Sequence, residues 1–149
     1  MNAYDVAVDA ALALGAVSGL VGLFGLFRWY RAQPSREFWV GLRAAQGLAI
    51  AYALLAGLEW LSGDRASNSL YYLYALLPIP VGFVAEQLRI VAADHVLASR
   101  DLDDAQAVGR LPADEQEDVV LAILRREMIV MALAAVVICF LALRAAGTY

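Results

Sequence analysis

Ionisable and amide side chains stand inside long apolar stretches of this chain, and they are the residues best placed to do chemistry. Arg43 and Gln46 are three residues apart, so they share one face of a predicted helix. An unpaired charge in hydrocarbon costs roughly 3 kcal/mol or more, so these groups must pair or face water. We predict pairs of Glu86 with Arg43 or Arg126, and of Glu127 with Arg89 or Arg43. The candidate binding residues are Arg43, Gln46, Glu86, Arg89, Arg126 and Glu127.

This predicted polar layer has two interpretations. In the structural one, the charges join helices and reach toward the membrane interface, where arginines contact phosphates. In the functional one, Arg43, Arg126 and Glu86 line a site for an anion, a proton or a lipid head group. Arg43, Gln46 and Glu86 lie deepest and favour the functional interpretation most.

The remaining reactive side chains predict neither an enzyme nor a metal site. His95 is the only histidine and Cys139 the only cysteine, so there is no zinc-binding Cys pair and no intramolecular disulfide. We interpret His95 as an exposed histidine at a helix end. A haem held by His95 with Met128 or Met131, or shared by two chains, is the alternative. We expect no catalytic residue, no metal and no cofactor.

Four apolar stretches must position these side chains, and 62% of the 149 residues are hydrophobic. A bilayer core needs about 20 apolar residues per helix, a length that each stretch reaches. We predict one all-α domain, residues 1–149, built as a four-transmembrane-helix bundle. The predicted spans are residues 4–27, 38–60, 70–91 and 119–143.

Arginine placement predicts the orientation, because cytoplasmic connectors carry an excess of basic residues. All eleven basic residues are Arg, and only Arg65 and Arg144 lie on the side of the termini. We therefore expect both termini to be extracytoplasmic, in the cytoplasmic (inner) membrane of a high-GC bacterium. The Arg residues of the opposite side are Arg28, Arg31, Arg36, Arg89, Arg100, Arg110, Arg125 and Arg126.

The connector at about residues 94–118 is acidic and is predicted to be partly helical. Leu102, Ala105, Val108 and Leu111 recur at a spacing near three, and Gly109 is a candidate stop. Pro112 suits the first turn of a helix that continues into the fourth span. In the first connector, Ser35 is the expected N-cap of the second span.

Pro78 and Pro80 lie near the middle of the third span. Each removes a backbone donor and crowds the preceding turn, so we predict a kink. In transporters such breaks can mark a substrate site, whereas many are plain packing kinks. A packing kink is the favoured interpretation.

Small residues form stripes on the first two spans. Such stripes allow membrane helices to approach closely. We expect the first and second spans to pack on each other, although the stripes also permit a homodimer or a membrane-protein partner. The stripes are Gly15, Gly19, Gly22 and Gly25 on the first span, and Gly41, Ala45, Ala49, Ala53 and Gly57 on the second.

Three segments carry a resemblance to a known type of protein. They are Tyr71-Tyr72-Leu73-Tyr74, Glu86-Gln87-Leu88-Arg89 and residues 107–112, Ala-Val-Gly-Arg-Leu-Pro. With them the chain resembles uncharacterised four-helix integral membrane proteins of high-GC bacteria, a resemblance that implies architecture but no activity. In architecture alone it is also similar to small haem or quinone bundles.

The sequence thus favours a non-catalytic membrane protein that serves as an accessory or interaction subunit. A small oligomeric transporter or channel using the polar layer is the first alternative, and a haem or quinone redox bundle is the second. The bilayer is the expected partner, and no nucleic acid is expected.

Overall fold

The computed structural model describes residues 3–63 and 66–149, and this part of the chain is helical, with no strand. The predicted all-α class is therefore confirmed for the described residues. The helices are α1 (Ala3–Tyr30), α2 (Arg36–Ser62), α3 (Leu70–Leu76), α4 (Pro78–Ala98), α5 (Ala105–Val108) and α6 (Ala113–Ala146).

Four helical segments are long and apolar enough to cross a membrane: Tyr4–Tyr30, Arg36–Ser62, Leu70–Ala98 and Ala113–Ala146. Each contains one of the four predicted apolar stretches. The fold fits a small multi-pass membrane protein.

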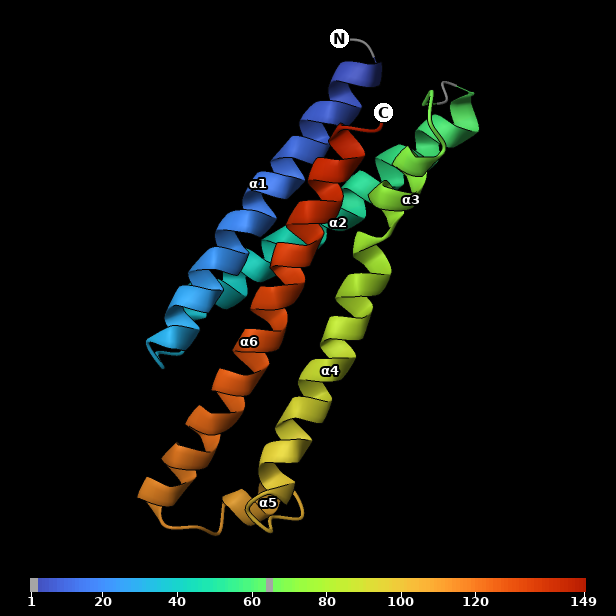
Figure 1. The fold of residues 1–149 in the computed structure, drawn as a ribbon. Coiled ribbons are helices and arrows are strands. Elements are labelled where there is room, and N and C mark those ends of the chain that lie inside the picture. Colours follow the sequence, from blue (N-terminus) through green and yellow to red (C-terminus); the bar gives the residue numbers. More distant parts are fainter. Residues whose placement is uncertain (1–2, 64–65) are drawn as a thin grey trace.

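The helices form an open bundle around α6 (Figure 1). Helices α1 and α6 run antiparallel side by side, α2 crosses behind them, and the α3–α4 span packs along α6 on the other side. Both termini lie at one end of the bundle, and the two Arg-bearing connectors lie toward the other (Figure 1). We call these the terminal end and the connector end.

The glycine stripe of α1 packs mainly on α6. A Cβ atom added at Gly22 would lie 2.7 Å from Val136 Cγ2 and 3.1 Å from Ala132 O, and one at Gly19 would lie 3.0 Å from Cys139 Sγ. The expected packing of the first two spans on each other is therefore only part of the arrangement. It occurs at Gly41, where an added Cβ would lie 3.1 Å from Val21.

Local signals set the start of α2 as predicted. The Oγ atom of Ser35 accepts a hydrogen bond from Phe38 N–H at 3.3 Å, which caps one of the orphan donors of the first turn. At the other end Gly63 adopts φ +89°, a left-handed conformation that ends a helix at little cost for glycine.

The third span breaks at its prolines, as predicted. Helix α3 ends at Leu76, Leu77 joins the two segments, and α4 begins at Pro78. The hydrogen bonds Leu77 N–H to Leu73 O (3.0 Å) and Val81 N–H to Leu77 O (3.1 Å) continue across the break. Pro78 and Pro80 supply no donor there, so α4 leaves α3 at an angle (Figure 1).

The connector between α4 and α6 contains helix, as predicted. Residues 94–98, which we assigned to the connector, continue α4, and the short helix α5 is capped by Asp104, whose Oδ1 accepts from Ala107 N–H at 2.8 Å. Helix α6 starts immediately after Pro112 and has 34 residues. At ~1.5 Å per residue it is about 51 Å long, which exceeds a hydrocarbon core of roughly 30 Å. Helices α4 and α6 accordingly reach beyond the end of α1 (Figure 1).

Candidate functional site

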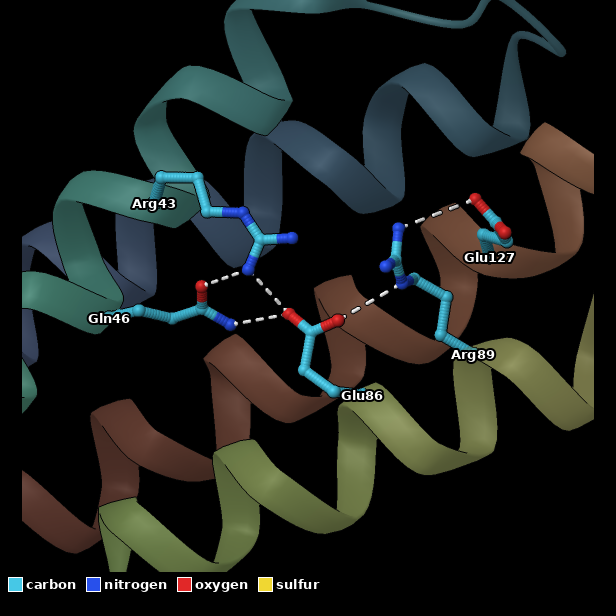
Figure 2. Close-up of polar contacts among 5 residues, drawn as sticks. All are labelled: Arg43, Gln46, Glu86, Arg89 and Glu127. Atoms are coloured by element: carbon cyan, nitrogen blue, oxygen red, sulfur yellow. Dashed lines mark hydrogen bonds and ion pairs between the residues drawn. The ribbon is translucent and has the colours of Figure 1, made fainter.

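Five of the six candidate residues meet in one cluster between α2, α4 and α6 (Figure 2). Glu86 of α4 is at its centre. Its Oε1 atom accepts from Arg43 Nη1 at 2.6 Å and from Gln46 Nε2 at 3.0 Å, both from α2. Arg43 Nη1 also donates to Gln46 Oε1 at 2.6 Å. The predicted pairing of Glu86 with an arginine of the second span is confirmed.

Arg89 continues the cluster toward α6. Its Nε atom lies 3.1 Å from Glu86 Oε2, and its Nη1 atom lies 3.8 Å from Glu127 Oε2. The Nε–H group does not point along a hydrogen bond, so the contact with Glu86 is an ion pair of close charges only. The guanidinium also lies 5.5 Å from the centre of the Trp39 ring, a cation–π distance. The pairing of Glu127 with Arg89 is therefore confirmed.

The cluster alternates in charge: Arg43, Glu86, Arg89 and Glu127 form a row across three helices (Figure 2). Its two positive and two negative charges balance. Helices α2 and α4 otherwise make few contacts with each other. The row is thus the main contact between α2 and α4 near Arg43 and Glu86.

A cavity of about 250 Å³ lies beside the cluster, between α2 and α4. Arg43, Gln46 and Glu86 form its polar end. Three of the apolar side chains around it are also exposed at the molecular surface: Ile50 by 54%, Ile79 by 41% and Phe83 by 66%. The cavity therefore opens sideways, toward the surroundings of the bundle. The other lining residues are Ala49, Pro78, Gly82 and Ile138.

Arg126 does not join the cluster. Its side chain is exposed, and within the described residues it makes no ion pair. Successive side chains on a helix are about 100° apart, so with Glu127 directed at α4, Arg126 must point away from it. The alternative partner of Glu86 was therefore wrong.

Sequence reasoning missed the cavity wall and the role of Trp39. Gly82 lies one helical turn before Glu86, at the i−4 position, and so on the same face. That spacing could have indicated a slot beside the carboxylate. The contact of Trp39 with Arg89 joins α2 to α4, and spacing in the sequence does not predict it.

The residues proposed for a haem lie in different environments. His95 is exposed in the last turn of α4, whereas Met128 and Met131 are each 1% exposed in the core near Phe38. Among the described residues, no three His, Cys, Asp or Glu side chains gather as metal ligands.

A second polar contact lies at the terminal end. Tyr71 O–H donates to Glu59 Oε2 at 3.2 Å, within an aromatic group that includes Tyr52 and Tyr149. From the sequence alone, Glu59 is expected either to reach toward the membrane interface or to pair with Arg65, and Arg65 lies outside the described residues.

No protein-family model, curated protein or solved structure matches this chain. Chemically, the cluster offers guanidinium donors beside a carboxylate whose Oε1 atom accepts two hydrogen bonds and whose Oε2 atom lies in an ion pair with Arg89. Such an arrangement can join helices and attract an anion. Neither a nucleophile nor a histidine belongs to it.

Proposed function

We propose that the chain is a non-catalytic accessory or interaction subunit of a bacterial inner-membrane assembly. The observation that carries this proposal is the uneven burial of the spans. Only 17% of the most apolar window of Leu70–Ala98 is buried, against 39% for Ala113–Ala146. The α3–α4 span thus offers the largest fraction of its surface to lipid or to a partner helix.

A groove on this span supports the proposal. It has a volume of about 470 Å³ between α4 and α6, and its walls are apolar. A transmembrane helix of a partner would gain van der Waals packing there, which is the main force that joins helices in lipid. The walls are formed by Leu77, Pro80, Val81, Val84, Ala85, Leu88, Val130, Leu133, Ala134 and Val137.

The absence of catalysis is part of the proposal. Glu86 forms ion pairs with Arg43 and Arg89, and Glu127 lies 3.8 Å from Arg89, so both carboxylates are partners of arginines in the structure. No nucleophile stands within the cluster.

Site-directed photo-crosslinking in intact cells tests the proposal. A crosslinking amino acid at Val84, in the groove, should give an adduct of discrete mass, either a second copy or another membrane protein. The matched control is Leu20, which is 71% exposed on α1 and lies outside the groove. Only lipid-sized adducts at both positions would refute the interaction role of this face.

A transporter is the second candidate, because the cavity between α2 and α4 reaches the Arg43–Glu86 pair. Arg43 and Glu86 would then handle an anion or a proton. Flux of protons and common anions into liposomes that contain the purified protein tests this function. A folded protein without flux would leave the accessory role as the proposal.

A further inference from the structure

Arg43 is a charged side chain with much of its surface outside the protein. It lies seven residues after the start of α2 at Arg36, about 10 Å along the helix at ~1.5 Å per residue. Its side chain is nevertheless 54% exposed. Within the described part of the chain, every contact of its guanidinium runs through Nη1. N–H donors inside a membrane span that form no hydrogen bond with the protein must bond to water or to lipid head groups.

The charge of Arg43 is only partly cancelled. Glu86 is shared between two guanidinium groups, Arg43 at Oε1 and Arg89 at Oε2, and Gln46 donates to it as well. Glu127 lies near Arg89, at the far end of the row (Figure 2). The end of the row at Arg43 therefore keeps positive character.

The cavity beside Arg43 is polar at one end and apolar beyond it. From Arg43 and Gln46 its walls continue to Ile50, Ile79 and Phe83, the side chains that are exposed at its mouth. Gly82 leaves room in the wall, since a Cβ atom added there would meet nothing within 4 Å. This sequence of surfaces matches an amphiphile with an anionic head and a hydrocarbon tail.

We propose that a glycerophospholipid of the surrounding bilayer binds between α2 and α4, with a phosphate oxygen on the Arg43 guanidinium. Arginine binds phosphate well because its planar group offers paired donors. The cavity takes the phosphate and the first part of one acyl chain, and the rest of the lipid stays in the bilayer through the lateral opening. The bound lipid then contacts both α2 and α4 at the cavity beside the Arg43–Glu86 ion pair.

Native mass spectrometry of the detergent-purified, full-length protein tests the proposal. Three probes are titrated: dioleoyl phosphatidylglycerol, dioleoylglycerol and sn-glycerol 3-phosphate. The phosphatidylglycerol should bind at one copy per chain. The diacylglycerol lacks the phosphate and the glycerol phosphate lacks the tails, so each should bind at least about tenfold more weakly.

Two variants locate the site. Arg43→Gln removes the phosphate donor and Gly82→Leu fills the slot without removing a charged residue, so each should weaken phosphatidylglycerol binding about tenfold or more. Two matched controls should bind it as the wild type does. Arg126→Gln removes an exposed arginine outside the cluster, and Gly57→Leu adds a side chain on α2 about 21 Å along the helix from Arg43, where a Cβ also meets nothing within 4 Å.

Several results would overturn the proposal. Equal binding by Gly82→Leu and Gly57→Leu would show that the cavity is not the site. If the diacylglycerol bound as tightly as phosphatidylglycerol, the phosphate would not be recognised. If glycerol phosphate bound as tightly as phosphatidylglycerol, the site would be one for a soluble anion. The test is independent of the accessory role, because crosslinking at Val84 and lipid binding at Arg43 report on opposite faces of α4.

Discussion

The α1–α6 interface and the gap between α2 and α4 join helices by opposite means. In the first, glycines bring two backbones so close that an added Cβ at Gly22 would meet the backbone atoms Val136 N at 3.0 Å and Ala132 O at 3.1 Å. In the second, the helices stay apart, and Arg43, Gln46 and Glu86 reach across beside a cavity of about 250 Å³.

The difference concerns what each interface can tolerate. Close packing in lipid depends on shape alone, so a single added side chain must separate α1 from α6. A polar link depends on charge balance and leaves room for another molecule. We therefore expect the first interface to carry most of the stability, and the second to carry binding.

The largest effect should follow from filling the close interface. Gly22→Leu should lower the free energy of unfolding by about 3 kcal/mol, because the new side chain meets the backbone of α6. Unfolding in mixed detergent micelles, followed by circular dichroism, measures the change. Gly47→Leu is the matched control and should lose little. Similar losses in both variants would mean that α1 and α6 do not approach as closely as the structure has them.

A smaller effect should follow from removing the central charge of the polar link. Glu86→Gln leaves Arg43 and Arg89 without their shared carboxylate and should lower the free energy of unfolding by about 2 kcal/mol. The comparison variant is Glu59→Gln, at the terminal end, where a neutral amide can still accept from Tyr71 O–H. We expect it to lose less than about 1 kcal/mol in the same assay. Negligible losses in both would argue against a stabilising polar layer.

Reversing the link should recover only part of that loss. In the double variant Glu86→Arg with Arg43→Glu, the pair survives in reverse, but the new arginine lies three residues from Arg89 on one helix face. We expect the free energy of unfolding of the double variant to lie roughly 1 kcal/mol below that of the wild type, about half of the loss in Glu86→Gln. Full recovery would show that Arg89 contributes nothing to the link. If the cluster also serves transport, liposome flux should stay low while the melting temperature recovers.

The orientation of the chain in the membrane decides on which side the polar link lies, and testing it requires no change in stability. The positive-inside rule predicts that both termini are extracytoplasmic, which would place the polar link in the cytoplasmic half of the membrane. A periplasm-dependent reporter enzyme fused after Tyr149 should be active. Signal from a reporter that works only in the cytoplasm would reverse the topology, and with it the leaflet from which Arg43 draws a lipid.

The amino-acid sequence by itself determined the features that depend on local chemistry. The four spans follow from runs of about 20 apolar residues, and the break between α3 and α4 follows from the missing donors of Pro78 and Pro80. Ser35 capped α2 for the same kind of reason. That Glu86 had to find an arginine also follows from the sequence, because a bare charge in hydrocarbon is too costly.

The tertiary structure decided which partner each of these features met. The glycine stripe of α1 indicates only that another helix can approach closely, and α6 rather than α2 is its main neighbour in the structure. Glu86 had two candidate arginines, and the rotation of α6, which directs Glu127 at α4, turned Arg126 outward and left Arg43 as its partner. The cavity beside Arg43 exists because α2 crosses the bundle at an angle, a property of how helices pack that no single stretch of sequence contains (Figure 1).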